Sequence, residues 1–486
     1  MSKFQGLDAY ISTTGAYELL PFRFERLEGG EVVLTNAVGE FAFLPQEKLQ
    51  ALVDHQLPPT DSDYAMLRMK HILREPGDEA TLELLALKTR TRLSHLANFT
   101  NLHLFVVSLR CDHSCQYCQV SRQSEDKAAF DMTRETADKS LDIVFRSPNQ
   151  AIKIEFQGGE PLLNFPLIQY VVEKAEQRNV AEQRNLQFVI TTTLSLATDD
   201  ILGYCRDHSI ILSSSLDGPE DLHNKNRPRP GRDSYARFVD GLNRARDIVG
   251  YDAVSALMTT SPASIARVKD IIDEYVRLGF NGIFLRHLSP YGFALKTKSY
   301  QAYNTEQWLK FFKEGLDYII ELNKAGIPFI EHYSNILLTK MLTSTDPGFV
   351  DLSNPSGAGI TAVVFNYDGE VYASDESRML KEMGDASFRL GNVHENSYEE
   401  IFTAEGLLTA LEESFTLSVP MCTDCAFEPW CGADPVFHHG MYGDMLGRKP
   451  ESEFCKRTTG VAKYLLEIMK KDQEAKELFM RWVNPC

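Results

Sequence analysis

The sequence is poor in several features that mark whole classes of protein. Its 486 residues contain nine cysteines, and its 50 lysines and arginines fall short of its 68 aspartates and glutamates, for a net charge of −18. A disulfide scaffold is denser in cysteine and usually has an even number, so it is excluded. The shortage of basic residues weighs against nucleic acid or an anionic membrane as the main partner.

Long apolar runs are also missing. The N-terminus, MSKFQGLDAYISTTG, has no apolar core of the kind a secretory signal needs. No uncharged stretch approaches the roughly 20 apolar residues of a transmembrane helix. We therefore expect a cytoplasmic protein without a membrane partner, in which spaced cysteines bind metal more often than they form disulfides. The 43% hydrophobic and 24% charged residues are ordinary for a globular chain.

The first hundred residues predict one small domain, with boundaries at 1–98. Three β-prone runs, separated by turn signals such as Gly29-Gly30, precede three segments with helical spacing of apolar residues. The runs are 19–26, 32–36 and 40–44, and the helical segments are 46–54, 64–74 and 81–97.

From residue 102, apolar runs alternate with amphipathic segments. Such alternation predicts an α/β fold with a parallel sheet covered by helices. Six units are fewer than the eight of a closed barrel, so a partial (β/α)6 TIM-like barrel over 99–300, or an open sheet, is expected. A helical linker (301–350) and a cysteine-rich extension (351–486) would follow. The runs are 102–109, 152–157, 186–192, 210–216, 253–259 and 282–288, and the helical segments are 133–146, 165–182, 198–206, 234–249 and 263–277.

Three cysteines follow the first of these strands in the loop CDHSCQYC. Cys111, Cys115 and Cys118 have C-x3-C-x2-C spacing, and three thiolates so close can ligate one small cluster. A structural zinc site has four ligands, and His113, which lies between two of the cysteines, is poorly placed to be the fourth. An iron–sulfur cluster held by three cysteines leaves one iron open.

This loop, with Tyr117 before its last cysteine, resembles the signature of the radical S-adenosylmethionine (SAM) enzymes. Further motifs extend the resemblance: QGGEP after the second strand, ITTTL after the third, and SLDGP followed by a histidine and an arginine. It implies that SAM is held at a [4Fe-4S] cluster and cleaved to a 5′-deoxyadenosyl radical that abstracts hydrogen from a substrate. The residues implied to bind SAM are Tyr117, Gly158, Gly159, Glu160, Pro161, Thr193, Ser215 and Arg227, and those binding the cluster are Cys111, Cys115 and Cys118.

A second group of four cysteines lies in the tail: Cys422, Cys425, Cys431 and Cys455. By spacing alone, four thiolates fit one zinc ion or one iron–sulfur cluster equally well. The run also resembles the SPASM extension of peptide-modifying radical SAM enzymes, which carries auxiliary [4Fe-4S] clusters. That resemblance implies one auxiliary cluster, fully ligated by cysteine and therefore suited to electron transfer or a structural role.

The chain departs from the SPASM pattern consistently. Ser356, Ser374 and Pro435 stand where further cysteines would fall, with Gly369 in the expected place between the serines. We infer that a second auxiliary cluster has been lost as a unit. Asp375, which follows Ser374, matches a catalytic base of sulfatase-maturing relatives; a plain turn aspartate is the alternative.

Three other features have simpler interpretations. His438-His439 are expected to be satisfied or solvent-facing histidines, because four cysteines already complete the ligand set. Cys205 is expected to be a buried free thiol, and nothing assigns a role to Cys486.

The strand-then-helix order of the first domain resembles the winged-helix-like domains that bind precursor leaders by strand addition. A structural role and nucleic-acid binding are the alternatives. Three stretches of sequence resemble the His-Xaa-Ser system radical SAM maturases: PFRFERL, SLRCDHSCQYCQVSR and FLRHLSPYGFA. This implies a precursor peptide with a leader as substrate, a second radical SAM protein, and an electron donor such as flavodoxin or ferredoxin.

The leading prediction is thus a radical SAM/SPASM peptide maturase that crosslinks or oxidises its peptide. One alternative is a radical SAM enzyme acting on a protein side chain or small molecule without a leader. The alternative of another class is a zinc-binding adaptor protein.

Overall fold

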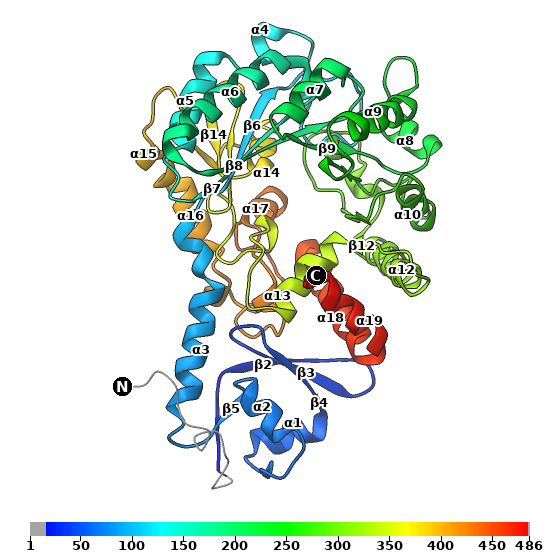
Figure 1. Cartoon of the computed structure of the whole chain (residues 1–486). Helices are drawn as coiled ribbons and strands as arrows, with labels where there is room; N and C mark the ends of the chain where they lie inside the picture. Colours follow the sequence, from blue (N-terminus) through cyan, green and yellow to red (C-terminus); the bar gives the residue numbers. More distant parts are fainter. Residues whose placement is uncertain (1–15, 485–486) are drawn as a thin grey trace.

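A computed structural model describes residues 16–484 of the chain. Figure 1 shows a small N-terminal domain at one end, a helix-covered sheet at the other, and the C-terminal helices between them. Cys486 lies outside the described residues. In the described part of the chain, no helix combines the length and the apolar character needed to cross a bilayer.

The core is an eight-stranded mixed sheet with the order β10-β9-β8-β7-β6-β13-β14-β15. Neighbouring strands from β10 to β13 pair in parallel, and β14 and β15 pair antiparallel. This confirms an α/β fold with parallel strands. The strands are β6 (Leu102–Ser108), β7 (Ala151–Gly158), β8 (Asn185–Thr192), β9 (Ile211–Ser215), β10 (Val254–Leu257), β13 (Ala362–Phe365), β14 (Glu370–Tyr372) and β15 (Arg389–Asn392).

Helices connect the parallel strands and bury their apolar faces against the sheet, as in other α/β proteins. The predicted segments all contain helices; the last begins at Val268, five residues later than predicted. The helices are α4 (Lys127–Phe130), α5 (Arg134–Val144), α6 (Phe165–Glu182), α7 (Asp199–Asp207), α8 (Glu220–Asn226), α9 (Ser234–Ile248) and α10 (Val268–Arg277).

The prediction of a sixth strand in the core sheet, over 282–288, was wrong. Only Gly282–Ile283 form a strand, β11, and it pairs with β12 (Ile330–Glu331) rather than with β10. The buried Glu331 carboxylate accepts the Leu285 N–H at 3.1 Å, which fixes this segment to β12. The sheet grows instead on its other side, where β13 to β15 from the predicted extension continue it beyond β6.

The next helices come from the C-terminal part of the chain, after β11. They are α11 (Phe293–Lys296), α12 (Thr305–Lys324), α13 (His332–Leu342), α14 (Asp375–Lys381), α15 (Tyr398–Phe402), α16 (Glu405–Glu413), α17 (Pro435–Tyr442), α18 (Glu453–Lys471) and α19 (Gln473–Val483). α12 packs against α18, and α14 packs against α17.

The N-terminal domain has the predicted three-stranded antiparallel sheet and helices, with one difference. Leu73–Arg74 form a strand, β5, that pairs with β1, instead of ending a helix. The short helix ends before His71, whose φ of 49° lies in the left-handed region. The elements are β1 (Glu18–Leu19), β2 (Phe22–Arg26), β3 (Glu31–Asn36), β4 (Phe41–Pro45), α1 (Gln46–Val53), α2 (Tyr64–Met69), β5 (Leu73–Arg74) and α3 (Glu79–Arg92).

The central strand of this domain is buried on both faces. Val32 and Leu34 belong to the domain's own core, whereas Val33 belongs to the large core of the rest of the chain. Trp430 Nε1 donates to the Gly39 carbonyl at 3.1 Å, and Arg92, 9% exposed, donates to the Pro429 carbonyl. The small domain is therefore docked directly on the cysteine-rich region.

Candidate radical SAM site

The loop after β6 is held in place at its base by a buried ion pair. Arg110 donates two hydrogen bonds to Asp131, each 2.7 Å long. Paired hydrogen bonds between arginine and a carboxylate fix orientation as well as distance. Farther along the loop, the Ser114 N–H donates to the Pro228 carbonyl at 2.7 Å. The loop that carries the three cysteines is thus anchored from two sides.

Two glycines after β7 let this loop pack closely. A Cβ added to Gly158 would lie 1.9 Å from the Ser108 carbonyl oxygen, and one on Gly159 would lie 2.2 Å from the Arg110 oxygen. The Gly159 and Glu160 N–H groups donate to those same two carbonyls. The resemblance implies that Gly158 and Gly159 bind SAM. In the structure they also allow close approach between two segments of the chain itself.

The predicted site residues come together from loops at one end of the sheet. One cavity is lined by all three loop cysteines and by most of the residues predicted to bind SAM, while Glu160 and Pro161 lie behind its wall. The predicted residues that line it are Cys111, Cys115, Cys118, Tyr117, Gly158, Gly159, Thr193, Ser215, Arg227 and Asp375.

Glu160 is fully buried and accepts four hydrogen bonds from the protein. They come from the N–H groups of Leu162 and Thr193 and from the hydroxyls of Thr192 and Thr193, at 2.7–3.1 Å. Four donors fill the usual acceptor capacity of a carboxylate. The resemblance implies that Glu160 binds SAM; in the structure its carboxylate orients Thr193, which lines the cavity.

Arg227 is held by a buried acid and an aromatic ring. Its Nη2 donates to Asp217 at 3.2 Å, and its guanidinium lies 5.6 Å from the centre of the Tyr117 ring. The Tyr117 hydroxyl also donates to Asp217. Among described residues, Arg227 Nε and the Gln157 amide nitrogen on the same cavity are buried without a partner. Unpaired buried donors are costly, so these two atoms fit a polar ligand.

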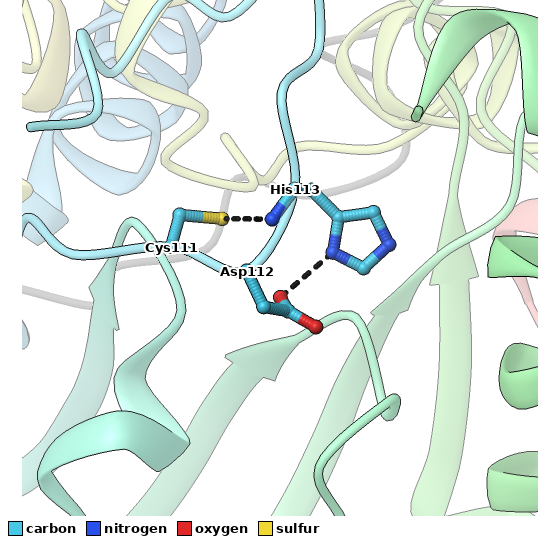
Figure 2. Close-up of side chains that lie close together, drawn as sticks. All are labelled: Cys111, Asp112 and His113. Carbon is cyan, nitrogen blue, oxygen red and sulfur yellow. Dashed lines mark hydrogen bonds and ion pairs between the residues drawn. The ribbon is translucent and has the colours of Figure 1, made fainter. Parts of the chain in front are cut away.

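His113 is not free to act as a metal ligand. Its Nδ1 lies 2.7 Å from an Asp112 oxygen, and its Nε2 lies 2.9 Å from the Ser234 hydroxyl. Figure 2 shows the imidazole facing the Asp112 carboxylate, while the Cys111 sulfur faces the His113 backbone nitrogen at 3.4 Å. Sequence reasoning did not foresee this network, because Ser234 is 121 residues away along the chain.

The three cysteines suit an iron–sulfur cluster better than a single ion. Burial raises the pKa of the Cys111 thiol and brings that of Cys115 to about 12, so both thiols are protonated until a bound metal displaces the proton. Around one zinc, thiolates stand about 3.8 Å apart, given bonds of about 2.3 Å. Among described residues, the only group of three or more candidate ligand atoms that all lie within 4.8 Å of one another is that of Cys111, Asp112 and His113. The three cysteine sulfurs do not form such a group.

The second set of cysteines converges between α16 and α18. Burial raises the pKa of all four thiols, and repulsion from another cysteine of the set adds to each. In the described part of the chain, these four sulfurs also do not form a group whose members all lie within 4.8 Å of one another. Thiolates around one zinc ion stand about 3.8 Å apart. Four thiols brought together in this way can be the ligands of one metal centre.

The simpler expectations for the other residues are confirmed. His438 is fully buried, with its ring nitrogens 2.9 Å from the Asp434 carbonyl and 2.8 Å from the Ser452 hydroxyl. His439 pairs with Asp385. Cys205 is a fully buried free thiol on α7.

The positions expected to have lost cysteines have structural tasks. Ser374 caps α14 and exchanges hydrogen bonds with Ser377, while Pro435 is the first residue of α17. The Ser356 hydroxyl accepts the Ala358 N–H. Asp375 lines the cavity, and its carboxylate lies 3.5 Å from Arg378 Nε.

An anchored three-cysteine loop at the end of a partial α/β barrel defines a radical SAM domain, and the comparison with known families agrees. Residues 105–288 match the family model of the radical SAM superfamily. The chain therefore contains a radical SAM domain over residues 105–288, and enzymes with this domain bind SAM at a [4Fe-4S] cluster.

Its relatives include several enzymes that modify proteins. It is 34% identical over 190 residues to an uncharacterised protein of Methanocaldococcus jannaschii, a match covering 39% of this chain and 63% of the relative. It is 21% identical to the serine-type anaerobic sulfatase-maturating enzyme of Bacteroides thetaiotaomicron, over 67% of this chain and 79% of that enzyme.

Two solved structures share the fold. The anaerobic sulfatase-maturating enzyme anSMEcpe with bound SAM has a TM-score of 0.63 at 17% identity, covering 78% of this chain and 99% of its own. SuiB of Streptococcus suis bound to SAM has a TM-score of 0.52 at 12% identity, covering 89% of this chain and 98% of its own. At these identities the similarity concerns the fold.

Glu160→Gln should weaken SAM binding by about 10- to 100-fold. The glutamine side chain would face the two Thr193 donors with either its NH2 group, which cannot accept a hydrogen bond, or its amide oxygen, which is a weaker acceptor than a carboxylate. The cost is about 1–3 kcal/mol. Equilibrium dialysis of SAM against the reconstituted enzyme measures the effect. Glu176→Gln, which changes a surface partner of His208, is the matched control. Equal affinity in the two variants would show that Glu160 does not position the SAM site.

Proposed function

We propose that this chain modifies a ribosomally made precursor peptide by radical SAM chemistry, forming a crosslink or an oxidised residue. The observation that carries the proposal is the cavity where the three-cysteine loop, the SAM-binding candidates and Asp375 meet. Bound SAM and a reduced [4Fe-4S] cluster would supply a 5′-deoxyadenosyl radical there. Relatives with this fold were solved with peptides, as in anSMEcpe with the Cp18Cys peptide.

The residues around the cavity divide the remaining work. Cys111, Cys115 and Cys118 would hold the SAM-binding cluster, and Arg227, oriented by Asp217, would bind the SAM carboxylate. Met258 and Met379 line the same cavity with apolar surface, which excludes water and competing hydrogen donors. Asp375 is the candidate base for a proton released from the substrate.

The four tail cysteines would hold one auxiliary [4Fe-4S] cluster. All its ligands come from the chain, so it suits electron transfer or structural support rather than substrate binding. We propose no second auxiliary cluster, because Ser356, Ser374 and Pro435 already have the structural tasks described above. Electrons would come from a donor such as flavodoxin or ferredoxin.

The N-terminal domain is the proposed site for the precursor's leader. A groove of about 540 Å³ between α2 and α3 carries apolar surface from Met69, 69% exposed, and Leu84, 39% exposed. Lys88 and His71 lie on the same groove. Exposed apolar patches often mark sites where another molecule binds. The leader could also add as a strand to an edge of the domain's sheet.

Co-expression with a precursor that carries His-Xaa-Ser repeats tests the proposal. We expect mass spectrometry to show the loss of two hydrogens for each crosslink or oxidation in the peptide. Unchanged mass and unchanged residue configuration in the presence of active enzyme would contradict peptide modification.

Two matched variants extend this test to the leader groove. Leu84→Glu should reduce the modified fraction and weaken peptide binding by about tenfold, since it places a charge on the apolar wall. Leu87→Glu lies on the same helix, is 57% exposed and does not line the groove, so it should behave like the wild type. Deleting the whole domain is a poorer test, because its sheet docks on Trp430 beside Cys431. Equal binding by both variants would reject the groove.

A further inference from the structure

Three carboxylates that do not line the cavity lie close enough to repel one another, and the proposed reaction gives none of them a role. Asp351 lies in the turn before Ser356, Glu376 is the second residue of α14, and Asp434 immediately precedes α17. The contact between α14 and α17 brings two of the three together. We call Asp351, Glu376 and Asp434 the acidic cluster.

The acidic cluster is crowded with negative charge. Burial raises the pKa of each carboxyl to about 7, and repulsion adds to each shift: Asp434 acts on Asp351, Asp351 on Glu376, and Glu376 on Asp434. Asp375 also repels Glu376. The three residues are partly exposed, and carboxylates that repel one another in this way are stabilised in their charged form by a nearby cation.

Two arginines approach the cluster but do not neutralise it. Arg286 Nη2 lies 3.7 Å from Glu376 Oε1, too far for a good hydrogen bond. The charge of Arg457 reaches Asp351 and Asp434, yet its Nε is buried without a hydrogen-bond partner among the described residues. Neither cation therefore makes a close hydrogen bond to the acidic cluster through these atoms.

An independent observation points to a ligand. Tyr291 is 1% exposed, and its hydroxyl has no hydrogen-bond partner in the described part of the chain. The charges of Asp434, Glu376 and Asp351 all act on this hydroxyl, which places it at the cluster. Leaving a buried hydroxyl unpaired is costly, so the site is built to receive a polar group.

The acidic cluster adjoins the cavity through Arg286. The Glu376 side chain keeps 16% of its surface accessible despite its depth in the protein, and the Arg286 side chain keeps 36%. Arg286 also lines the cavity together with Asp375, the neighbour of Glu376. Arg286 and Asp375 therefore connect the acidic cluster to the cavity.

The spacing of the carboxylates selects the class of ligand. Mg²⁺ or Ca²⁺ needs oxygens about 2.0–2.6 Å from the ion, so adjacent ligands lie about 3–4 Å apart. Within the described residues, the acidic cluster is not among the groups of ligand atoms within 4.8 Å of one another. A guanidinium or ammonium group is larger and offers several N–H donors that reach separated acceptors.

We propose that the acidic cluster binds a cationic side chain of the substrate peptide and thereby selects the residue presented to the cavity. This subsite rests on the proposed function and adds a specificity determinant to it. The cluster lies in the segments where the sequence lacks the second set of SPASM-like cysteines: Glu376 is two residues after Ser374, and Asp434 adjoins Pro435. Carboxylates thus occupy a region that the resemblance assigns to an iron–sulfur cluster.

A pair of blocked tripeptides tests the subsite on the reconstituted full-length enzyme with SAM. Acetyl-Gly-Arg-Gly-amide carries the charge, and its citrulline counterpart has nearly the same shape without it. We expect the wild type to bind the arginine peptide at least about tenfold more tightly, as charge-assisted hydrogen bonds imply. Titration followed by NMR gives the two dissociation constants.

The double variant Asp351→Asn, Glu376→Gln should bring the preference to less than about twofold, because it keeps the shape of both side chains and removes their charge. Glu413→Gln, at an exposed position on α16, is the matched control and should keep the wild-type preference. A wild type without preference, or a double variant that retains it, would overturn the proposal. Mn²⁺ that displaces the arginine peptide from the wild type would overturn it too, since the site would then be a metal site.

Formation of 5′-deoxyadenosine from SAM is measured in the same samples. Its absence from the wild type contradicts the proposed function. Equal binding of the two peptides by an enzyme that does form it contradicts only the cationic subsite.

Discussion

Replacing Cys111, Cys115 and Cys118 together with alanine is expected to reduce the formation of 5′-deoxyadenosine from SAM to the background without enzyme. The effect should exceed the roughly 10²- to 10³-fold loss caused by removing one stabilising contact at an active site. The reason is that the variant loses every protein ligand of the cluster on which the chemistry depends. Reconstitution under anaerobic conditions with a strong reductant, followed by chromatography of the nucleoside, measures the outcome.

The fold should survive this triple substitution, because the loop keeps its other anchors. The Arg110–Asp131 pair and the Gly159 N–H bond to Ser108 do not involve the cysteines. Cys205→Ala is the control, since it removes a thiol that is buried on α7 outside the cavity. SAM cleavage that persists in the triple variant would show that the primary site has been placed wrongly.

The reconstituted chain is expected to bind about eight irons with a similar amount of acid-labile sulfide, as two [4Fe-4S] clusters require. Cys431→Ala should reduce this to about four and lower the melting temperature. The stability loss follows because a bound metal centre contributes to folding and because Cys431 adjoins Trp430, which joins the N-terminal domain to this region through Gly39. Iron and sulfide analysis with a thermal melt tests both parts.

The metal content distinguishes the alternatives sharply. About twelve irons would contradict the loss of the second auxiliary cluster. Zinc in the tail without labile sulfide would contradict the iron–sulfur assignment there. Cys205→Ala again serves as the control and should keep the full iron content.

The sequence was most informative where function depends on neighbours along the chain. The CDHSCQYC loop, the GGEP turn and the SLDGP turn each follow a strand, and parallel strands end at the same edge of a sheet. Their meeting around one cavity was therefore predictable. The helix from Phe165 to Glu182 also matches its predicted bounds, because an apolar stripe with a helical period is a strong local signal.

Short strands and buried polar partners were not predictable in the same way. The 282–288 run looked like the earlier strands, but only Gly282–Ile283 form a strand, and that strand pairs with β12. Leu73–Arg74 became a strand because β1 is available to pair with it. In both places a partner distant in sequence outweighed the local preference, as β-propensity commonly allows.

The sequence by itself determined the class of chemistry, because cluster ligation needs particular residue types at particular spacings within a short loop. Only the tertiary structure decided how the surrounding side chains divide the work: Glu160 supports Thr193, both His113 nitrogens are engaged, and the N-terminal domain docks on the cysteine-rich region. It also decided that Asp351, Glu376 and Asp434 meet beside Tyr291. Electrostatics and hydrogen bonding depend on distance in space, and folding brings these distant residues together.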